Sequence, residues 1–275
     1  MKNSSYTSLG IIVAAAVMWG GYGLKSQFRG TQRDRSVIGE EKIFSPSASH
    51  FDVAARGPIG PSSFDIKTFG PLNKTNPKET KEVHRSLREM QRLLKCFESE
   101  NCNFDQATAQ SYRTALRETL SNEILNFQKL VESNNFQDPS LMAKASDVTK
   151  FFLNFPDDDI KDQAISLASS LPISNEICET LISGLSESSS APLYEKGFGE
   201  LKRYIGTSEK PRVDAFIVQS ILTGSGYVSK LVARESLPFI SSENTPQFLE
   251  VLNQLPKRSQ EFEMLKANVD ESRRL

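Results

Sequence analysis

Residues 138–171 read DPSLMAKASDVTKFFLNFPDDDIKDQAISLASSL, and this stretch indicates the fold class of the chain. Asp138-Pro139 is typical of a helix start, because proline at the first helical position has no backbone N–H that needs a partner. A second helix is predicted to begin near Asp157, with apolar residues every three or four positions at Ile160, Ala164, Leu167 and Leu171. Neither helix can bury its apolar stripe alone, so the pair is expected to pack against further helices.

The same two starts recur along the rest of the chain. First helices are predicted to begin at Ser174-Asn175, Lys210-Pro211 and Thr245-Pro246, at steps of about 35 residues. Second helices are predicted to begin near Ala191, Tyr227 and Lys257. Apolar residues keep the helical spacing in the later units, at Val213, Ile217, Ile221, Leu222, Phe248, Leu249, Leu252 and Leu255. A period in this range indicates stacked helix pairs, each buried by its neighbours.

This period, with prolines near the helix starts, resembles the HEAT-like family of α-solenoid repeats over roughly residues 138–270. The resemblance implies a scaffold with an extended binding face, and it implies no catalysis. Two features depart from a regular array. The spacing between the two helix starts shrinks along the chain, and Gly197, Gly199, Gly224 and Gly226 loosen two units. A regular α-solenoid and an irregular helical bundle therefore both fit the pattern.

Two longer helices are predicted before the repeats. Asn76-Pro77 opens the first, and Gln106 to Ser133 covers the second. Their apolar stripes are Val83, Leu87, Met90, Leu94 and Phe97 in the first, and Tyr112, Leu116, Leu120, Ile124, Phe127, Leu130 and Val131 in the second. We expect an antiparallel hairpin that opens an all-α domain over residues 79–275.

The first 24 residues are predicted to form a membrane anchor. No charged residue occurs from Asn3 to Leu24, and about 20 helical residues are enough to span the hydrocarbon core. The residues that would face lipid or its interface are Leu9, Ile11, Ile12, Val13, Val17, Trp19 and Leu24. A cleaved signal peptide and a buried helix of a water-soluble protein are the alternatives. No small-residue cleavage pattern follows the apolar core, which favours the anchor.

Residues 25–78 are predicted to be a disordered linker between the anchor and the helical domain. They contain turn-forming runs such as 57–63 (GPIGPSS) and 70–71 (GP), and their apolar residues follow no period. The phenylalanines at 44, 51, 64 and 69 could dock onto a partner or onto the helical domain. The simpler interpretation is a spacer that gives the domain reach from the membrane.

The three cysteines bear on the compartment. Cys96 lies near the end of the first long helix and Cys102 in the following loop, so a disulfide is predicted if that helix ends near Phe97. Two free thiols are the alternative. A disulfide is stable in an oxidising compartment and favours export of the domain, whereas the positive-inside rule applied to Lys25 and the arginines after it favours the cytoplasm. We expect export. Cys178 is predicted to be a buried apolar residue.

Residues that carry catalytic or metal chemistry are scarce. Lys and Arg number 33 against 34 Asp and Glu, which gives no net attraction to nucleic acid, and only two histidines occur, His50 and His84. No phosphate-binding glycine loop is present. Asp157-Asp158-Asp159 is better explained as a helix cap than as a cation site. No catalytic residue, cofactor site or metal site is predicted.

The expected function is that of a membrane-anchored, non-catalytic protein-interaction scaffold in the cell envelope, with an unknown protein or peptide partner. The alternative is a cell-wall hydrolase of the lytic transglycosylase type, because such enzymes combine a helical superhelix with a glutamate followed by serine. Five Glu-Ser pairs occur in the chain. Glu235-Ser236 is the best of them, because Val232, Leu237 and Phe239 would desolvate the Glu235 carboxyl and raise its pKa.

Overall fold

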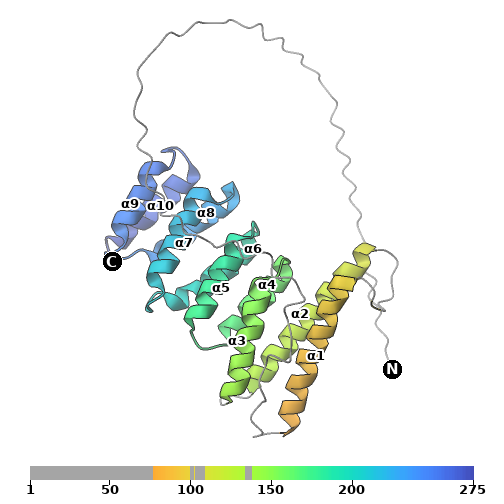
Figure 1. Cartoon of the computed structure of the whole chain (residues 1–275). Helices are drawn as coiled ribbons and strands as arrows, with labels where there is room; N and C mark the ends of the chain where they lie inside the picture. Colours follow the sequence, from red (N-terminus) through yellow and green to blue (C-terminus); the bar gives the residue numbers. More distant parts are fainter. Residues whose placement is uncertain (1–76, 100–101, 103–108, 134–137) are drawn as a thin grey trace, which may run out of the picture. The chain divides into compact units, whose positions relative to one another are not determined.

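The computed structural model describes residues 77–99, 102, 109–133 and 138–275, and every regular element in these ranges is helical (Figure 1). The all-α prediction is therefore confirmed for this part of the chain. The predicted anchor over residues 1–24 and almost all of the predicted linker lie outside the described residues. Among the helices that are described, none combines the length and the apolarity that crossing a membrane requires.

The first two helices, α1 (Pro77–Ser99) and α2 (Ala109–Ser133), pack along each other. Their apolar stripes face inward, and Leu87, Met90, Leu116 and Leu120 are completely buried. Helix α1 begins at the predicted Pro77, and α2 ends at the predicted Ser133. The described part of the second helix starts at Ala109, three residues after the predicted start. The end of α1 lies beside the start of α2, so the two form the expected antiparallel hairpin.

The remaining helices follow the predicted period. The first helices of the pairs are α3 (Pro139–Leu153), α5 (Asn175–Ser186), α7 (Lys210–Thr223) and α9 (Thr245–Gln254). The second helices are α4 (Asp158–Ser169), α6 (Ala191–Leu201), α8 (Gly226–Glu235) and α10 (Gln260–Ser272). First helices thus start at 139, 175, 210 and 245, at steps of 35 or 36 residues. Helix α10 begins three residues after the predicted Lys257, because the Ser259 hydroxyl caps it by accepting the Phe262 N–H.

The helices form two layers in which each element contacts its neighbours in the series. One layer is α3, α5, α7 and α9, with contacts between successive members. The other is α2, α4, α6, α8 and α10, again contacting in order (Figure 1). The two layers bury one continuous apolar core between them. This neighbour-by-neighbour packing is the arrangement that the repeated apolar stripes require.

Local signals explain why the helices begin where they do. The Asp138 carboxylate accepts the backbone N–H groups of Ser140 and Leu141 at the start of α3. Asp157 does the same for the backbone N–H groups of Asp159 and Ile160, which confirms its predicted capping role in α4.

Within the described residues, no group of three acidic, histidine or cysteine side chains is placed to hold a metal ion.

Long polar side chains bind the exposed carbonyl ends of neighbouring helices. Arg203 lies just beyond the end of α6. Its guanidinium group donates to the carbonyl oxygen of Ala168, in the last turn of α4, at 3.1 Å and to that of Leu171, just after α4, at 2.7 Å. Asn268 of α10 donates to the Ala233 carbonyl oxygen of α8 at 2.8 Å. The last carbonyls of a helix have no partner within it, so these bonds satisfy them and fix the register of neighbouring pairs.

Gly184 in α5 marks a close approach between two first helices, α3 and α5. A Cβ atom at this position would collide with the carbonyl oxygen of Leu153 at the end of α3. The Gly184 carbonyl oxygen also accepts a hydrogen bond from the buried Lys161 ammonium group at 2.9 Å. Only glycine allows the two backbones to approach this closely.

The substitution Gly184→Ala should therefore lower the free energy of unfolding by about 1–3 kcal/mol, because α3 and α5 must move apart. Urea denaturation followed by circular dichroism measures the change. Gly199→Ala in α6 is the matched control, since Gly199 is exposed and no atom lies within 4 Å of its Cβ position. The control should gain about 0.5–1 kcal/mol from helix propensity. Equal behaviour of the two variants would contradict the close approach.

Candidate functional site

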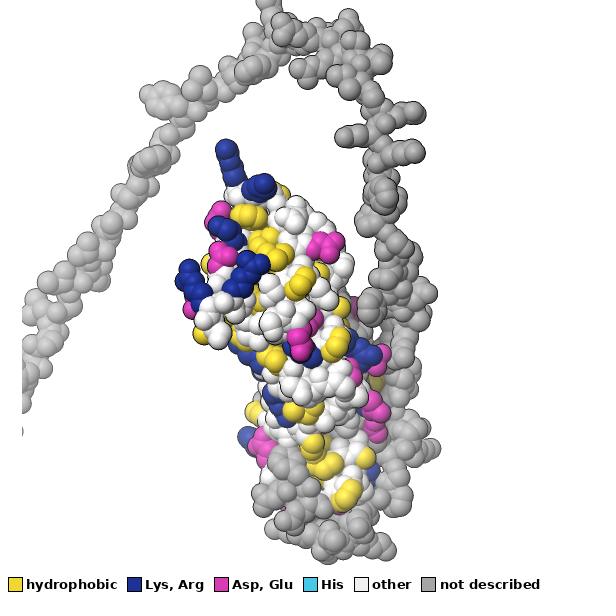
Figure 2. All heavy atoms as spheres, turned by 90° about the vertical axis from the view of Figure 1, so that its left-hand side faces the viewer, with side chains coloured by type: hydrophobic (Ala, Val, Ile, Leu, Met, Phe, Trp, Pro, Cys, Tyr) yellow, Lys and Arg dark blue, Asp and Glu magenta, His cyan; other side chains and the backbone are white. Residues whose placement is uncertain are grey.

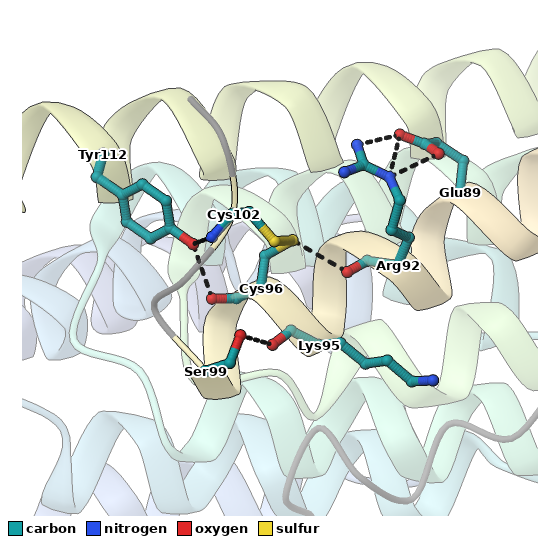
Figure 3. Close-up of a disulfide and its surroundings, with 7 residues drawn as sticks. All are labelled: Glu89, Arg92, Lys95, Cys96, Ser99, Cys102 and Tyr112. Carbon is teal, nitrogen blue, oxygen red and sulfur yellow. Dashed lines mark hydrogen bonds and ion pairs between the residues drawn. A yellow bond between two sulfur atoms is a disulfide. The ribbon is translucent and has the colours of Figure 1, made fainter. Parts of the chain in front are cut away.

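The hairpin end carries the predicted disulfide. Cys96 and Cys102 are bonded, with their Cα atoms 5.5 Å apart (Figure 3). The Cys96 residue is fully buried in α1, whereas Cys102 is half-buried. The third cysteine, Cys178, is free and buried in α5, as predicted. Burial raises the pKa of the Cys178 thiol to about 12, so it stays protonated and unreactive at neutral pH.

Tyr112 of α2 holds the two ends of this corner together. Its buried hydroxyl donates to the Cys96 carbonyl oxygen at 3.0 Å and accepts the Cys102 N–H at 3.3 Å (Figure 3). The hydroxyl therefore satisfies one carbonyl at the end of α1 and one amide of the loop. The sequence pattern identified Tyr112 only as a member of the apolar stripe. Nothing in its spacing distinguishes a tyrosine that uses its hydroxyl from a phenylalanine-like core residue.

The outward face of α1 carries a row of cations that the sequence reasoning missed. Five exposed side chains follow one another at steps of four or three residues: Lys81, Arg85, Arg88, Arg92 and Lys95. These five residues are named the basic row. Their spacing puts them on one side of the helix, opposite the buried Val83, Met90 and Leu94. The near-balance of charge over the whole chain conceals this row, and a search for helical spacing among cations would have found it.

Charge is unevenly distributed among the described segments. Helix α1 contains six Lys and Arg against four Asp and Glu, a net charge of +2. Residues 138–275 contain 15 Lys and Arg against 20 Asp and Glu, a net charge of −5. The helix pairs are therefore acidic and the outer hairpin helix is basic. A surface that attracts α1 electrostatically repels the helix pairs.

A polar groove of about 400 Å³ lies between α2 and α4. Its lining residues are Arg117, Glu118, Ser121, Asn122, Asp159, Asp162 and Gln163. Arg117 and Asp159 form an ion pair across it at 2.8 Å, and Asp162 pairs with Lys196 of α6 at 2.7 Å. These charges are already paired with each other. The groove offers mixed hydrogen-bonding groups, as a peptide backbone would need, and its lining holds three carboxylates, Glu118, Asp159 and Asp162, against the single cation Arg117.

The face of the domain shown in Figure 2 carries hydrophobic side chains in several separate patches among charged and neutral ones. Half-buried apolar residues occur on each first helix: Met142, Phe151, Ile182, Val218, Leu222 and Leu249. The largest exposed apolar side chains of the helix-pair region, apart from the C-terminal residue, are Tyr227 and Ile173, and they lie on different segments. Scattered apolar residues of this kind are ordinary on a protein surface.

Two glutamates test the hydrolase alternative. Glu235, its candidate acid, has a side chain 31% exposed and paired with the adjacent Arg234 at 3.0 Å. The Glu235 carboxylate is therefore partly open to solvent and has a cationic neighbour. Glu200 is the buried one: its side chain is 1% exposed, with Arg203 at 2.6 Å and the Ser169 hydroxyl at 2.9 Å. It lies at the junction of α6 with α4, where its partners give it a role in packing.

No family model, curated protein or solved structure matches this chain. The predicted site residues are therefore assessed against the structure alone. The structure brings Cys96 and Cys102 together, while the predicted anchor residues from Leu9 to Leu24 lie outside the described residues.

Thiol counting should distinguish the three cysteines. Without reductant, an alkylating reagent at about pH 8 should label no cysteine of the native protein, because Cys178 is buried and Cys96 and Cys102 are bonded. Denaturation without reductant should expose one thiol, and reduction should expose all three. Mass spectrometry counts the labels. Cys178→Ala is the control and should show none before reduction, whereas two labels in that variant would contradict the disulfide.

Burial raises the pKa of the Glu200 carboxyl above its usual range, and hydrogen bonds from Ser169 and Arg203 offset only part of this effect. A carboxyl with a raised pKa binds its proton more tightly in the folded state. Its contribution to stability is therefore present at low pH and is lost as the pH rises through the folded-state pKa.

We expect the wild type to lose stability relative to Glu200→Gln as the pH rises above about 4, the ordinary pKa of a glutamate carboxyl, since glutamine does not titrate. Urea denaturation of both proteins as a function of pH gives the difference in unfolding free energy. Glu250→Gln, at an exposed position of α9, controls for the loss of one negative charge. A difference that stays constant with pH, or that moves in the opposite direction, would contradict the raised pKa.

Proposed function

We propose that the protein is a membrane-anchored, non-catalytic scaffold of the cell envelope, whose exported helical domain binds a protein or peptide. The observation that carries the proposal is the packing of each described helix pair against the neighbouring pairs, in two layers. Such packing leaves a long side-chain surface along each layer, and proteins of this architecture use that surface for binding. We further infer that the pairs are HEAT-like repeats of an α-solenoid.

The anchor and the export are supported by different parts of the chain. Residues 3–24 contain no charge and match the length of a membrane-spanning helix, with Trp19 near one end. The Cys96–Cys102 disulfide closes a short loop, and such bonds persist where the surroundings are oxidising. Binding would involve the polar groove between α2 and α4, because its paired charges and amides match the hydrogen-bonding groups of an extended peptide.

The full chain, expressed in a Gram-negative bacterium, should stay in the membrane fraction after alkaline carbonate extraction. A double substitution, Val13→Glu with Val17→Glu, should release it, because each carboxylate at the centre of a span costs roughly 2.5–3.5 kcal/mol. Val13→Leu with Val17→Leu is the matched control and should remain in the membrane. Release of the wild type from the membrane would contradict the proposed anchor. Reduced Cys96 and Cys102 in intact cells would contradict the proposed export of the helical domain.

Binding of a partner protein is tested by solubilising the membrane fraction in detergent, followed by chemical cross-linking and mass spectrometry. A single partner should cross-link to lysines near the groove, such as Lys196, and the cross-links should weaken in Arg117→Glu. An exposed control, Lys266→Glu on α10, should keep them. Cross-links confined to residues outside α2–α6, or the release of cell-wall fragments by the purified chain, would contradict a non-catalytic scaffold that binds through this groove.

A further inference from the structure

The basic row of α1 is long, straight and exposed. Its five members, Lys81 to Lys95, span 14 residues of one helix, which corresponds to about 21 Å at 1.5 Å per residue. Both steps in the row, four and three residues, return to the same side of a helix. The row therefore presents five cations along one line.

Within the described residues, most of these charges have no ion-pair partner. Arg92 forms an ion pair with Glu89 beside it (Figure 3). In the part of the chain that the structure describes, Lys81, Arg85, Arg88 and Lys95 have no carboxylate within ion-pair distance. Cations without an ion-pair partner on a folded surface attract external anions.

The fold holds the row rigidly on the outside of the domain. The opposite side of α1 is buried, including Val83, Leu87, Met90 and Leu94. The end of α1 is also fixed to the start of α2 by the disulfide and by Tyr112.

We propose that the basic row binds the anionic phospholipid headgroups of the membrane and so holds the helical domain against the bilayer. The choice of lipid over other polyanions rests on the proposed membrane attachment, because a tethered domain stays within reach of the bilayer. The acidic residues of the helix pairs support the same orientation, because a net charge of −5 is repelled by an anionic surface. The row would thus face the lipid while the groove stays open to a partner.

The strength of such binding follows from the number of cations. Each Lys or Arg near an anionic membrane surface strengthens binding by about fivefold, and the attraction extends over a Debye length. Raising the salt from roughly 0.1 M to roughly 1 M shortens this length from about 10 Å to about 3 Å. Binding by the row should therefore be lost at high salt.

Lysine footprinting on the full chain tests the proposal. The chain is mixed with vesicles of phosphatidylcholine alone or of phosphatidylcholine with phosphatidylglycerol, and an amine-acylating reagent is added. Acylation of Lys81 and Lys95, read by mass spectrometry, should slow with the anionic vesicles only, and high salt should restore it. Lys129, Lys202 and Lys266 are exposed outside the row and should react at the same rate in both mixtures.

A charge-reversal pair makes the test specific to the row. Arg85→Glu with Arg88→Glu should raise the lipid concentration for half-protection of Lys81 and Lys95 by at least about 25-fold, from about fivefold per lost cation. Lys257→Glu with Arg258→Glu changes the net charge equally at exposed positions and should leave it unchanged. Circular dichroism confirms that both variants are folded.

Other occupants of the row give different footprints. Equal protection by both kinds of vesicle, or no protection by either, would overturn the proposal. Protection by a polyuridine RNA without protection by anionic vesicles would assign the row to nucleic acid instead. Protection that grows with protein concentration in the absence of lipid would assign it to a second copy. The footprint compares anionic with neutral vesicles, both of which the proposed anchor could enter, so a released chain in the carbonate extraction and a failed footprint remain separate results.

Discussion

A helix of ten to fifteen residues with one apolar face cannot bury that face by itself, and in this protein the neighbouring helix pair covers it. Phe198 of α6 shows how this works across a boundary. Its ring lies 6.4 Å from that of Phe216 in α7 and 5.5 Å from that of Phe239, which follows α8. A single core residue thus joins successive pairs. Full burial of such a side chain contributes roughly 1.5–3 kcal/mol, so each pair depends strongly on its neighbours.

Much of this arrangement could be predicted from the sequence, because its causes are local. Proline at the first turn and Asp or Ser at the cap determine where a helix begins, and the starts at Asn175, Lys210 and Thr245 were predicted to the residue. The disulfide followed from the position of Cys102 beyond a helix end. Contacts between residues far apart in the chain have no comparable local pattern in the sequence. The bonds from Arg203 and Asn268 to carbonyls of other helices depend on how pairs stack, which spacing alone does not specify.

The functional surfaces were harder to predict than the fold, for two physical reasons. Composition averages charge over the whole chain, so balanced totals concealed the basic row of α1 and the acidic character of the helix pairs. The groove between α2 and α4 combines residues from segments about 40 positions apart, such as Arg117 and Asp159, and only the folded chain brings them together. Both surfaces lie on the hairpin or beside it.

Hydrogen exchange in a single core variant tests the neighbour-by-neighbour packing most directly. Phe248 of α9 is completely buried, and Phe248→Ala removes roughly 3–5 kcal/mol of packing. If each helix pair is stabilised mainly by its neighbours, the backbone amides of α7 to α10 should lose protection against hydrogen exchange, while those of α3 and α4 keep theirs. An equal loss of protection from α3 to α10 would show one indivisible core and would contradict stacking as the basis of the fold.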